Sequence, residues 1–247
     1  MSRAKLISLN CGTQLTLKAN ATLVLDGDLC MLVDPGAFMD INEIDASLNT
    51  HCGLNVSDLN TIYYTHLHFD HYRQYPWGDN IKKIYIPINE YQYISQLMAL
   101  RNNEKEYTAY IEKTHDVISP VFLRQFLKIA HEDRYRVEDL LKLGQIELIS
   151  EDTNISDNII TIGLDGHCAG QLGLKILTQE GTAIIAGDAA LSLEDYCSNN
   201  CDHHLIMFDQ HRWQLSKNKL CEADYVIPGH GPWFDPHKKS QFQPIEG

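Results

Sequence analysis

Short apolar runs separated by turn residues mark the strands that this chain is expected to form. Residues 21–25 and 29–33 are apolar, and Asp26-Gly27-Asp28 between them is typical of a hairpin turn. Residues 60–65, with the sequence NTIYYT, are β-branched and aromatic, which favours a strand. The same kind of run predicts further strands at residues 83–86, 145–149, 159–162, 172–177, 182–186 and 224–227.

Helical periodicity is found in three other places. Residues 42–49 and 210–221 each predict one helix, whereas residues from about 89 to 143 predict two or three, with a break at Pro120. The order is therefore strands, helix, strand, helices, strands, helix, strand. It favours the α/β class and, within that class, an αββα sandwich in which helices cover the outer faces of two sheets. We expect one domain over residues 1–247, with a helical insertion at about 89–143.

Composition narrows the classes of function. The formal net charge is −13 and no basic stripe is present, which disfavours a nucleic-acid partner. No apolar run approaches the roughly 18 residues that a membrane span needs, and the first residues, MSRAKLISLNCG, lack the apolar stretch of a signal peptide. We therefore expect no membrane partner and a cytoplasmic location, where the seven scattered cysteines stay reduced.

The strongest motif directly follows the predicted strand at residues 60–65. It reads His66-Leu67-His68-Phe69-Asp70-His71 and places four metal-ligand side chains within six residues. His66 and His68 are two positions apart, so on extended backbone both point the same way and can bind one cation. Asp70 and His71 follow where the chain turns and can reach a second cation. A histidine-rich surface loop is the alternative, but this spacing after a strand favours a metal site.

Three more candidate ligands each follow a predicted strand. His167 lies in DGHCAG, Asp188 in AGDA and His230 in IPGHG. Taken alone, a histidine or aspartate at the end of a strand is more often structural. The order H-x-H-x-D-H, then H, D and H, makes a shared metal site the better interpretation.

This set of motifs resembles the metallo-β-lactamase superfamily, in its dinuclear hydrolase branch, over residues from about 4 to 235. HLHFDH and its spacing to DAA are similar to the N-acyl-homoserine lactonases. The run from AIIAGDA to VIPGHGPWF is similar to the small proteins called metallo-β-lactamase domain-containing protein 1. By this resemblance, His66, His68 and His167 hold one metal, Asp70, His71 and His230 hold a second, and Asp188 bridges the two. Three neutral histidines suit zinc, with iron or manganese as alternatives.

The resemblance implies a dinuclear metal-dependent hydrolase that acts on a small ester, lactone or thioester through a metal-bridging hydroxide. Asp70 is then the catalytic residue that orients the hydroxide and carries a proton to the leaving group. The expected partner is a small-molecule substrate, and a homodimer is left open. Two alternatives are a phosphodiesterase that acts on a nucleotide or RNA, and a metal-binding sensor without turnover.

Two departures from known branches bear on the substrate. The β-lactamases of this fold generally have a cysteine at the position of Asp188, so antibiotic hydrolysis is not expected. The lactonases usually place a catalytic tyrosine three residues after the bridging aspartate, where this sequence has Leu191. Tyr196, or a tyrosine of a lid, could take its place.

The role of three further features is left open by the sequence. Asp34 could orient a metal-bound histidine or could cap a turn before Pro35. The aromatic-rich residues from about 89 to 143 could form a lid or an ordinary outer helical layer. The cluster of Cys197, Cys201, His203 and His204 fits a loop at the rim of the active site better than a separate zinc site.

Overall fold

The computed structural model describes residues 3–13, 18–137 and 144–238, and two sheets dominate this part of the chain. The first has six strands in the spatial order β1 (Lys5–Asn10), β2 (Ala21–Asp26), β3 (Leu29–Val33), β4 (Thr61–Tyr63), β5 (Lys83–Pro87) and β7 (Ile146–Ile149). The second has five, in the order β13 (Tyr225–Pro228), β11 (Gly181–Gly187), β10 (Leu172–Thr178), β9 (Ile159–Gly163) and β8 (Asn154–Ser156).

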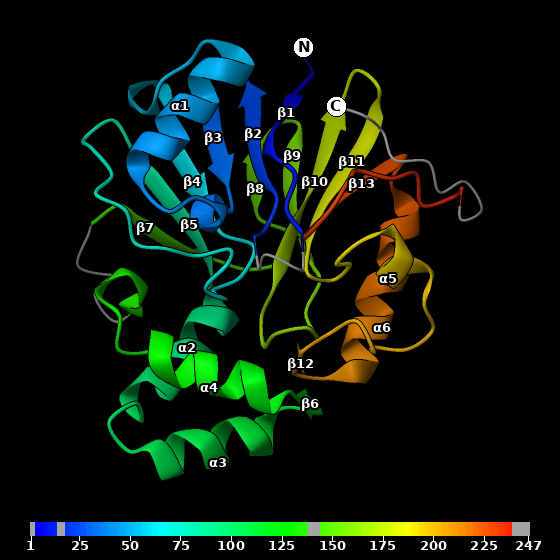
Figure 1. The fold of residues 1–247 in the computed structure, drawn as a ribbon. Coiled ribbons are helices and arrows are strands. Elements are labelled where there is room, and N and C mark those ends of the chain that lie inside the picture. The colour runs from blue at the N-terminus through cyan, green and yellow to red at the C-terminus, as the bar shows by residue number, and fades with distance from the viewer. Residues whose placement is uncertain (1–2, 14–17, 138–143, 239–247) are drawn as a thin grey trace.

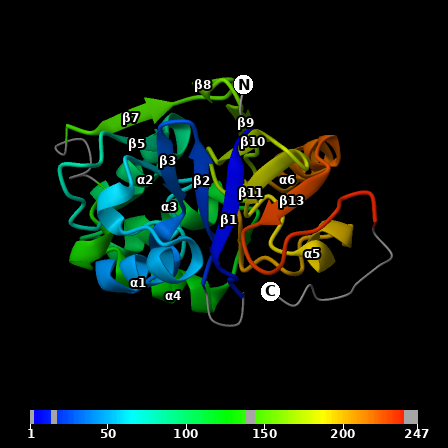
Figure 2. The ribbon, with the colours of Figure 1, turned by 90° about the horizontal axis from the view of Figure 1, so that it is seen from above.

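Helices cover both outer faces of this pair of sheets. Figures 1 and 2 show α1 (Ile41–Cys52) on the outer side of the six-stranded sheet, and α5 (Leu193–Cys197) and α6 (Gln210–Lys219) beyond the five-stranded sheet. Below the sheets in the view of Figure 1 lie α2 (Ile88–Ala99), α3 (Glu104–Thr114) and α4 (Pro120–Ile129). The predicted α/β class and αββα sandwich are confirmed.

Alternation along the strands explains these layers. Met31 and Val33 of β3 are buried between the two sheets, whereas Leu32 between them packs toward the helices of its own side. In β11, Ile185 faces the other sheet and Ile184 faces the layer that contains α5. Both faces of these central strands are therefore buried, so the sequence shows continuous apolar runs instead of an alternating pattern.

Most predicted elements are present, and the differences have local causes. Pro120 does not interrupt a helix but begins α4, directly after Ser119, whose side chain accepts a hydrogen bond from Val121 N. The insertion contains three described helices, and residues 138–143 at its predicted end lie outside the described residues. Five elements were not predicted from the sequence: β1, β8, α5 and the two-residue strands β6 (Val117–Ile118) and β12 (Ile206–Met207). These elements are short or lack turn signals.

The strand directions bring several strand ends to one edge. Strands β11 and β13 are parallel, and β9 shares their direction because it and β11 are both antiparallel to β10. In the other sheet, β3 and β4 are parallel. The loops that follow these strands carry the predicted metal ligands, so they meet at one end of the sandwich. No helix in the described ranges is long and apolar enough to cross a membrane.

Candidate metal centre

The loop after β4 buries all four of its candidate ligand side chains. His66 and His71 are completely buried, and His68 and Asp70 are nearly so. The backbone turns sharply here, because the N–H groups of His71 and Tyr72 both donate to the carbonyl of His68, at 3.0 and 2.8 Å. This turn lets Asp70 and His71 diverge from His66 and His68, as the motif predicted.

Leu67 anchors this loop in the core. Its side chain is fully buried in the cluster between the six-stranded sheet and the helices, and Tyr135 Oη donates a hydrogen bond to its carbonyl. Phe69 is partly buried, with its ring 5.6 Å from that of Phe122 in α4. The apolar residues of the motif therefore hold the backbone while the polar ones face the opposite side.

The remaining three candidates follow strands of the other sheet. His167 comes after β9, Asp188 after β11 and His230 after β13, and each is about 4% exposed. Gly229 allows two of these loops to approach each other. A Cβ atom at Gly229 would lie 1.8 Å from Asp188 Oδ1, so a larger residue would displace the carboxylate.

The structure brings all seven predicted ligand residues into two adjoining groups, in each of which the ligand atoms lie within 4.8 Å of one another. In the first group, His167 Nε2 is 3.0 Å from His68 Nδ1 and 3.3 Å from Asp188 Oδ2. His66 Nε2 lies 4.0 Å from the same Asp188 oxygen. Ligands of a tetrahedral zinc ion with bonds of about 2.0–2.1 Å are separated by about 3.3 Å, which these distances approach.

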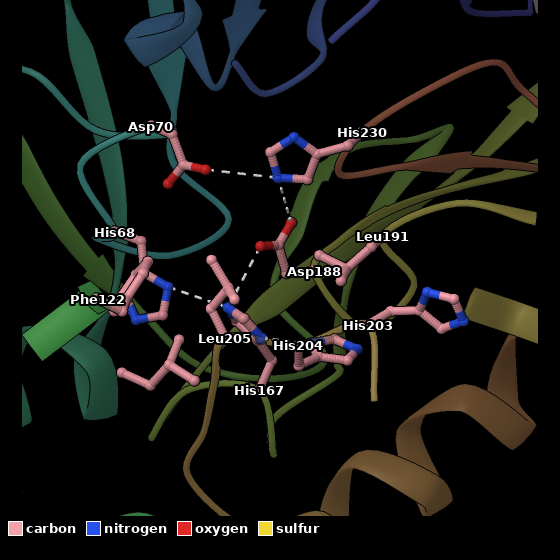
Figure 3. A pocket seen from close by; sticks show the side chains of 11 residues that line it. His68, Asp70, Phe122, His167, Asp188, Leu191, His203, His204, Leu205 and His230 are labelled. Carbon is pink, nitrogen blue, oxygen red and sulfur yellow. Dashed lines mark hydrogen bonds and ion pairs between the residues drawn. The ribbon is translucent and has the colours of Figure 1, made fainter. Parts of the chain in front are cut away.

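The second group uses the other oxygen of Asp188. His71 Nε2 lies 3.1 Å from Asp188 Oδ1, and His230 Nε2 lies 3.5 Å from it. Asp70 completes the group, with Oδ2 at 3.4 Å from His230 Nε2 (Figure 3). The two oxygens of one carboxylate therefore face two different groups, which is the geometry of a bridging ligand.

Several of these atoms lack a well-aligned hydrogen bond. His66 Nε2, His71 Nε2 and Asp188 Oδ1 are buried and make no hydrogen bond of good geometry among the described residues, although His71 Nε2 and Asp188 Oδ1 lie 3.1 Å apart. Leaving a buried polar atom without a hydrogen bond costs about 1–3 kcal/mol, so such atoms within the two groups fit cations better than an empty interior. Imidazole nitrogens and carboxylate oxygens are also suitable donors for divalent metals such as zinc.

The electrostatics divide the histidines into two sets. Burial lowers the pKa of His66 and His167 well below the usual value and that of His68 to about 3, so these three are neutral, as metal ligands must be. Burial also opposes protonation of His71 and His230, but neighbouring carboxylates together outweigh it. Asp188 and Asp34 raise the pKa of His71, and Asp188 and Asp70 raise the pKa of His230. Bound cations would balance the negative charge of Asp188 in place of the protonated histidines, and His71 and His230 would then lose their extra protons.

Asp34 supports ligands of both groups. Its Oδ2 accepts hydrogen bonds from His71 Nδ1 at 2.9 Å and from Thr65 Oγ1 at 2.7 Å, and Thr65 Oγ1 lies 3.0 Å from His66 Nδ1. Asp34 makes no side-chain capping hydrogen bond to the turn that follows. It orients histidines, so the interpretation as a turn cap is wrong. Its left-handed backbone, with φ of 51°, is the kind of strain that accumulates at functional sites.

The cluster of Cys197, Cys201, His203 and His204 does not form a separate metal site among the described residues, because neither group of potential ligands includes any of them. His203 lines the cavity, but Figure 3 shows its imidazole directed toward α5 and away from the ligands. His204 is buried, and its Nδ1 lies 3.0 Å from Nδ1 of His167. Both histidines line the cavity, as predicted for a loop at its rim, and His204 also contacts a ligand residue.

A cavity of about 230 Å³ opens over the two groups. Its lining combines five of the candidate ligands with His203, His204 and the apolar residues Phe122, Leu191, Leu205 and Ile206. The helical insertion contributes Phe122 of α4, while its Tyr93, Tyr107 and Tyr135 are buried in the core. The insertion is therefore both a wall of the cavity and an ordinary packed layer.

Tyr196 does not take the place of the tyrosine that the lactonases have. Its ring packs on Phe234, with 5.2 Å between the ring centroids, within the cluster behind the five-stranded sheet. It does not line the cavity, whereas Leu191 does. The cavity wall at this position is apolar.

Glu90 is a buried residue of the site that the sequence did not reveal, because a lone glutamate in a helix carries no signal. It lies in the first turn of α2, and its Oε1 accepts a hydrogen bond from Leu67 N at 3.3 Å, between His66 and His68. Burial raises the pKa of Glu90 to about 7, although the N–H groups around it oppose the shift.

A pH-dependent contribution to stability follows for Glu90. The unfolded chain loses this proton near pH 4.5 and the folded protein near pH 7, so the folded state binds more protons between these values and loses stability as the pH rises. We expect Glu90→Gln, which cannot ionise, to gain stability relative to the unsubstituted protein between pH 5 and pH 7. Urea unfolding of both proteins in the presence of a chelator measures this, and an equal difference at both pH values would contradict it.

Known proteins share the family and the fold of this chain. The model of the metallo-beta-lactamase superfamily matches residues 16–230. No curated protein matches the sequence. Among solved structures, a putative metallo-beta-lactamase from Thermotoga maritima superposes with a TM-score of 0.62 at 13% identity, covering 95% of this chain and 100% of that one.

Two lactonase structures are also similar in fold. AidC, a dizinc quorum-quenching lactonase bound to a product, superposes with a TM-score of 0.59 at 18% identity, over 87% of this chain and 73% of that one. A quorum-quenching N-acyl homoserine lactone lactonase superposes with a TM-score of 0.55 at 17% identity, over 99% and 98%. At such identities the likeness shows the fold. The family match covers most of the chain and bears out the predicted class, a metal-dependent hydrolase: the chain belongs to the metallo-beta-lactamase superfamily.

Proposed function

We propose that this protein is a dinuclear metal-dependent hydrolase whose substrate is a small ester, lactone or thioester with an apolar group. The observation that carries the proposal is the position of Asp188 at the base of the cavity, with Oδ2 in one group of ligand atoms and Oδ1 in the other. A site for a single cation would not need the two oxygens of Asp188 to lie in different groups of ligand atoms.

Each side chain of the two groups then has a defined task. His66, His68 and His167 would hold the first cation, Asp70, His71 and His230 the second, and Asp188 both. When bound, such a pair of cations activates water at neutral pH and polarises the bond that is to be broken. The donors suit zinc, with iron or manganese as alternatives.

Asp70 is proposed to carry a proton as well as to bind a cation. It lines the cavity and has one oxygen, Oδ2, near His230. A carboxyl group beside the reacting bond can accept a proton from water and deliver it to the departing oxygen or sulfur.

The apolar wall supports a small organic substrate. Phe122, Leu191 and Ile206 line the cavity together with the ligands, and Leu205, which also lines it, is 47% exposed. Burial of an apolar group of the substrate contributes roughly 0.8 kcal/mol per CH₂. A cavity of about 230 Å³ suits a short acyl or lactone group better than a polymer.

A panel of substrates tests the proposal. We expect turnover of lactones, p-nitrophenyl esters or thioesters by protein loaded with zinc, manganese or iron, and little turnover of bis(p-nitrophenyl) phosphate. Activity confined to the phosphodiester would overturn the substrate class. Binding of two metals without turnover of any compound would indicate a sensor.

Two exposed leucines provide a matched pair for the apolar wall. Leu205 lines the cavity, whereas Leu215 on α6 is 52% exposed and does not. Leu205→Ser should raise KM for substrates with longer acyl groups, and Leu215→Ser should leave it unchanged. Equal effects of the two substitutions would argue against an apolar subsite at Leu205.

A further inference from the structure

We infer that His204 and Asp195 form a buried relay that fixes His167 as an Nε2 ligand of the first cation. The inference rests on the proposed metal site and adds two residues that lie behind its ligand His167. Both side chains are fully buried. His204 comes from the loop before β12, and Asp195 comes from the short helix α5.

The first link of the relay is the contact between two imidazoles. His167 Nδ1 and His204 Nδ1 lie 3.0 Å apart, on the side of the His167 ring opposite the ligand group (Figure 3). A cation on His167 Nε2 uses the lone pair of that nitrogen, so the proton of His167 must be on Nδ1. His167 therefore donates, and His204 Nδ1 must accept.

The second link follows from the first. If Nδ1 of a neutral His204 accepts, its proton is on Nε2, and this atom lies 3.1 Å from Asp195 Oδ1. Both atoms are buried and neither makes a well-aligned hydrogen bond in the described part of the chain, so the 3.1 Å contact between them is the compensation that each has at hand. Asp195 Oδ2 is already occupied, because it accepts a hydrogen bond from Leu191 N at 2.9 Å. One arrangement of protons thus satisfies the path from the cation to Asp195.

Neighbouring groups hold the relay in place. The ring of Trp213 packs edge-on against His204 at 5.1 Å, and its Nε1 donates to the carbonyl of Ala189 at 3.1 Å. Lys217 Nζ lies 4.2 Å from the Trp213 ring and donates to the backbone carbonyl of Asp195 at 2.9 Å. The layer of α5 and α6 is therefore connected to the first metal group through the side chain of His204.

Three substitutions of His204 in the full-length chain test the relay. Asn places its Oδ1 where Nδ1 was and can still accept from His167, whereas Phe keeps a ring against Trp213 and accepts nothing. Gln resembles the Nε2 side and retains only the contact to Asp195. Loss of an outer partner typically costs about 10–100-fold in metal affinity. We expect His204→Phe and His204→Gln to lose this much affinity for the first cation, and His204→Asn to lose less. The affinity for the second cation should not change in any of the three variants.

The measurement is the binding of Co²⁺ in competition with a chelator, with the visible absorption of the bound cobalt as the signal. Thermal unfolding of the metal-free proteins is the control for folding. Loss of His167 ligation should change the spectrum of the first cobalt only. Wild-type affinity in His204→Phe would overturn the relay, as would equal losses in Asn and Phe. No cation bound by the unsubstituted protein would overturn the proposed metal site together with the relay.

Asp195→Asn provides a second test if His204→Phe does not fold. The substitution keeps the volume of the side chain. Its amide oxygen must still accept from Leu191 N, so its NH₂ group faces His204 Nε2. His204 would then have to carry its proton on Nδ1, where it would point at the Nδ1 proton of His167 and repel it. We expect weaker binding of the first cation, and unchanged binding would contradict the relay.

Discussion

Asp188→Ala is expected to bind one cation or none and to lose turnover by at least about 10²–10³-fold, since removing a single stabilising group from an active site costs that much. The reason is the shared position of Asp188, whose two oxygens are 3.3 Å from His167 Nε2 and 3.1 Å from His71 Nε2. Without the carboxylate, neither group keeps its anionic bridge. Elemental analysis and the rate on the best substrate of the panel measure the two effects.

Two further variants make this test specific. Asp188→Asn keeps one oxygen donor and should retain one cation. Asp133→Ala removes a carboxylate that is 86% exposed and paired with Arg136, so it should alter neither metal content nor rate. Two bound cations in Asp188→Ala would refute the bridging role.

Removal of the metals is expected to abolish activity and to lower the melting temperature by roughly 8–16 °C. A ligand present at 1,000 times its Kd stabilises the folded state by about 4 kcal/mol, and 1 kcal/mol corresponds to about 2–4 °C for a protein of this size. The loss is expected because His66 Nε2, His71 Nε2 and Asp188 Oδ1 are buried without a well-aligned hydrogen bond among the described residues.

The measurement is a thermal melt before and after chelation, followed by addition of zinc. Recovery of both the melting temperature and the activity shows that the loss is not due to irreversible unfolding. A melting temperature that is unchanged by complete chelation would contradict the assignment of the buried atoms to metal ligation.

The seven candidate ligands could be identified from sequence because of where they stand. Each comes from a loop that directly follows a strand, and His66 and His68 are spaced by two. The strands are apolar on both faces, so their ends are recognisable along the chain. Parallel strands then deliver His167, Asp188 and His230 to the same edge.

Residues that act through tertiary contacts could not be chosen from sequence. The sequence did not distinguish His203 from His204 within the predicted rim loop. Only the folded loop shows that His204 contacts His167 while His203 points elsewhere. Glu90 lies in a helix from which nothing indicated contact with the Leu67 backbone. Tyr196 was a reasonable substitute by sequence distance, but it packs on Phe234.

Short elements show the same limit. The helix α5 has five residues, too few for a hydrophobic period, yet it carries Asp195 to the back of the site. Strand β1 (Lys5–Asn10) is held by its antiparallel pairing with β2. Such elements depend on partners that are remote in sequence.

Anomalous X-ray diffraction from crystals of the zinc-loaded protein tests the central claim most directly. The account predicts two zinc peaks about 3.5–4 Å apart, one beside His66, His68 and His167 and the other beside Asp70, His71 and His230, with one oxygen of Asp188 directed at each. A single peak, or peaks away from Asp188, would contradict it.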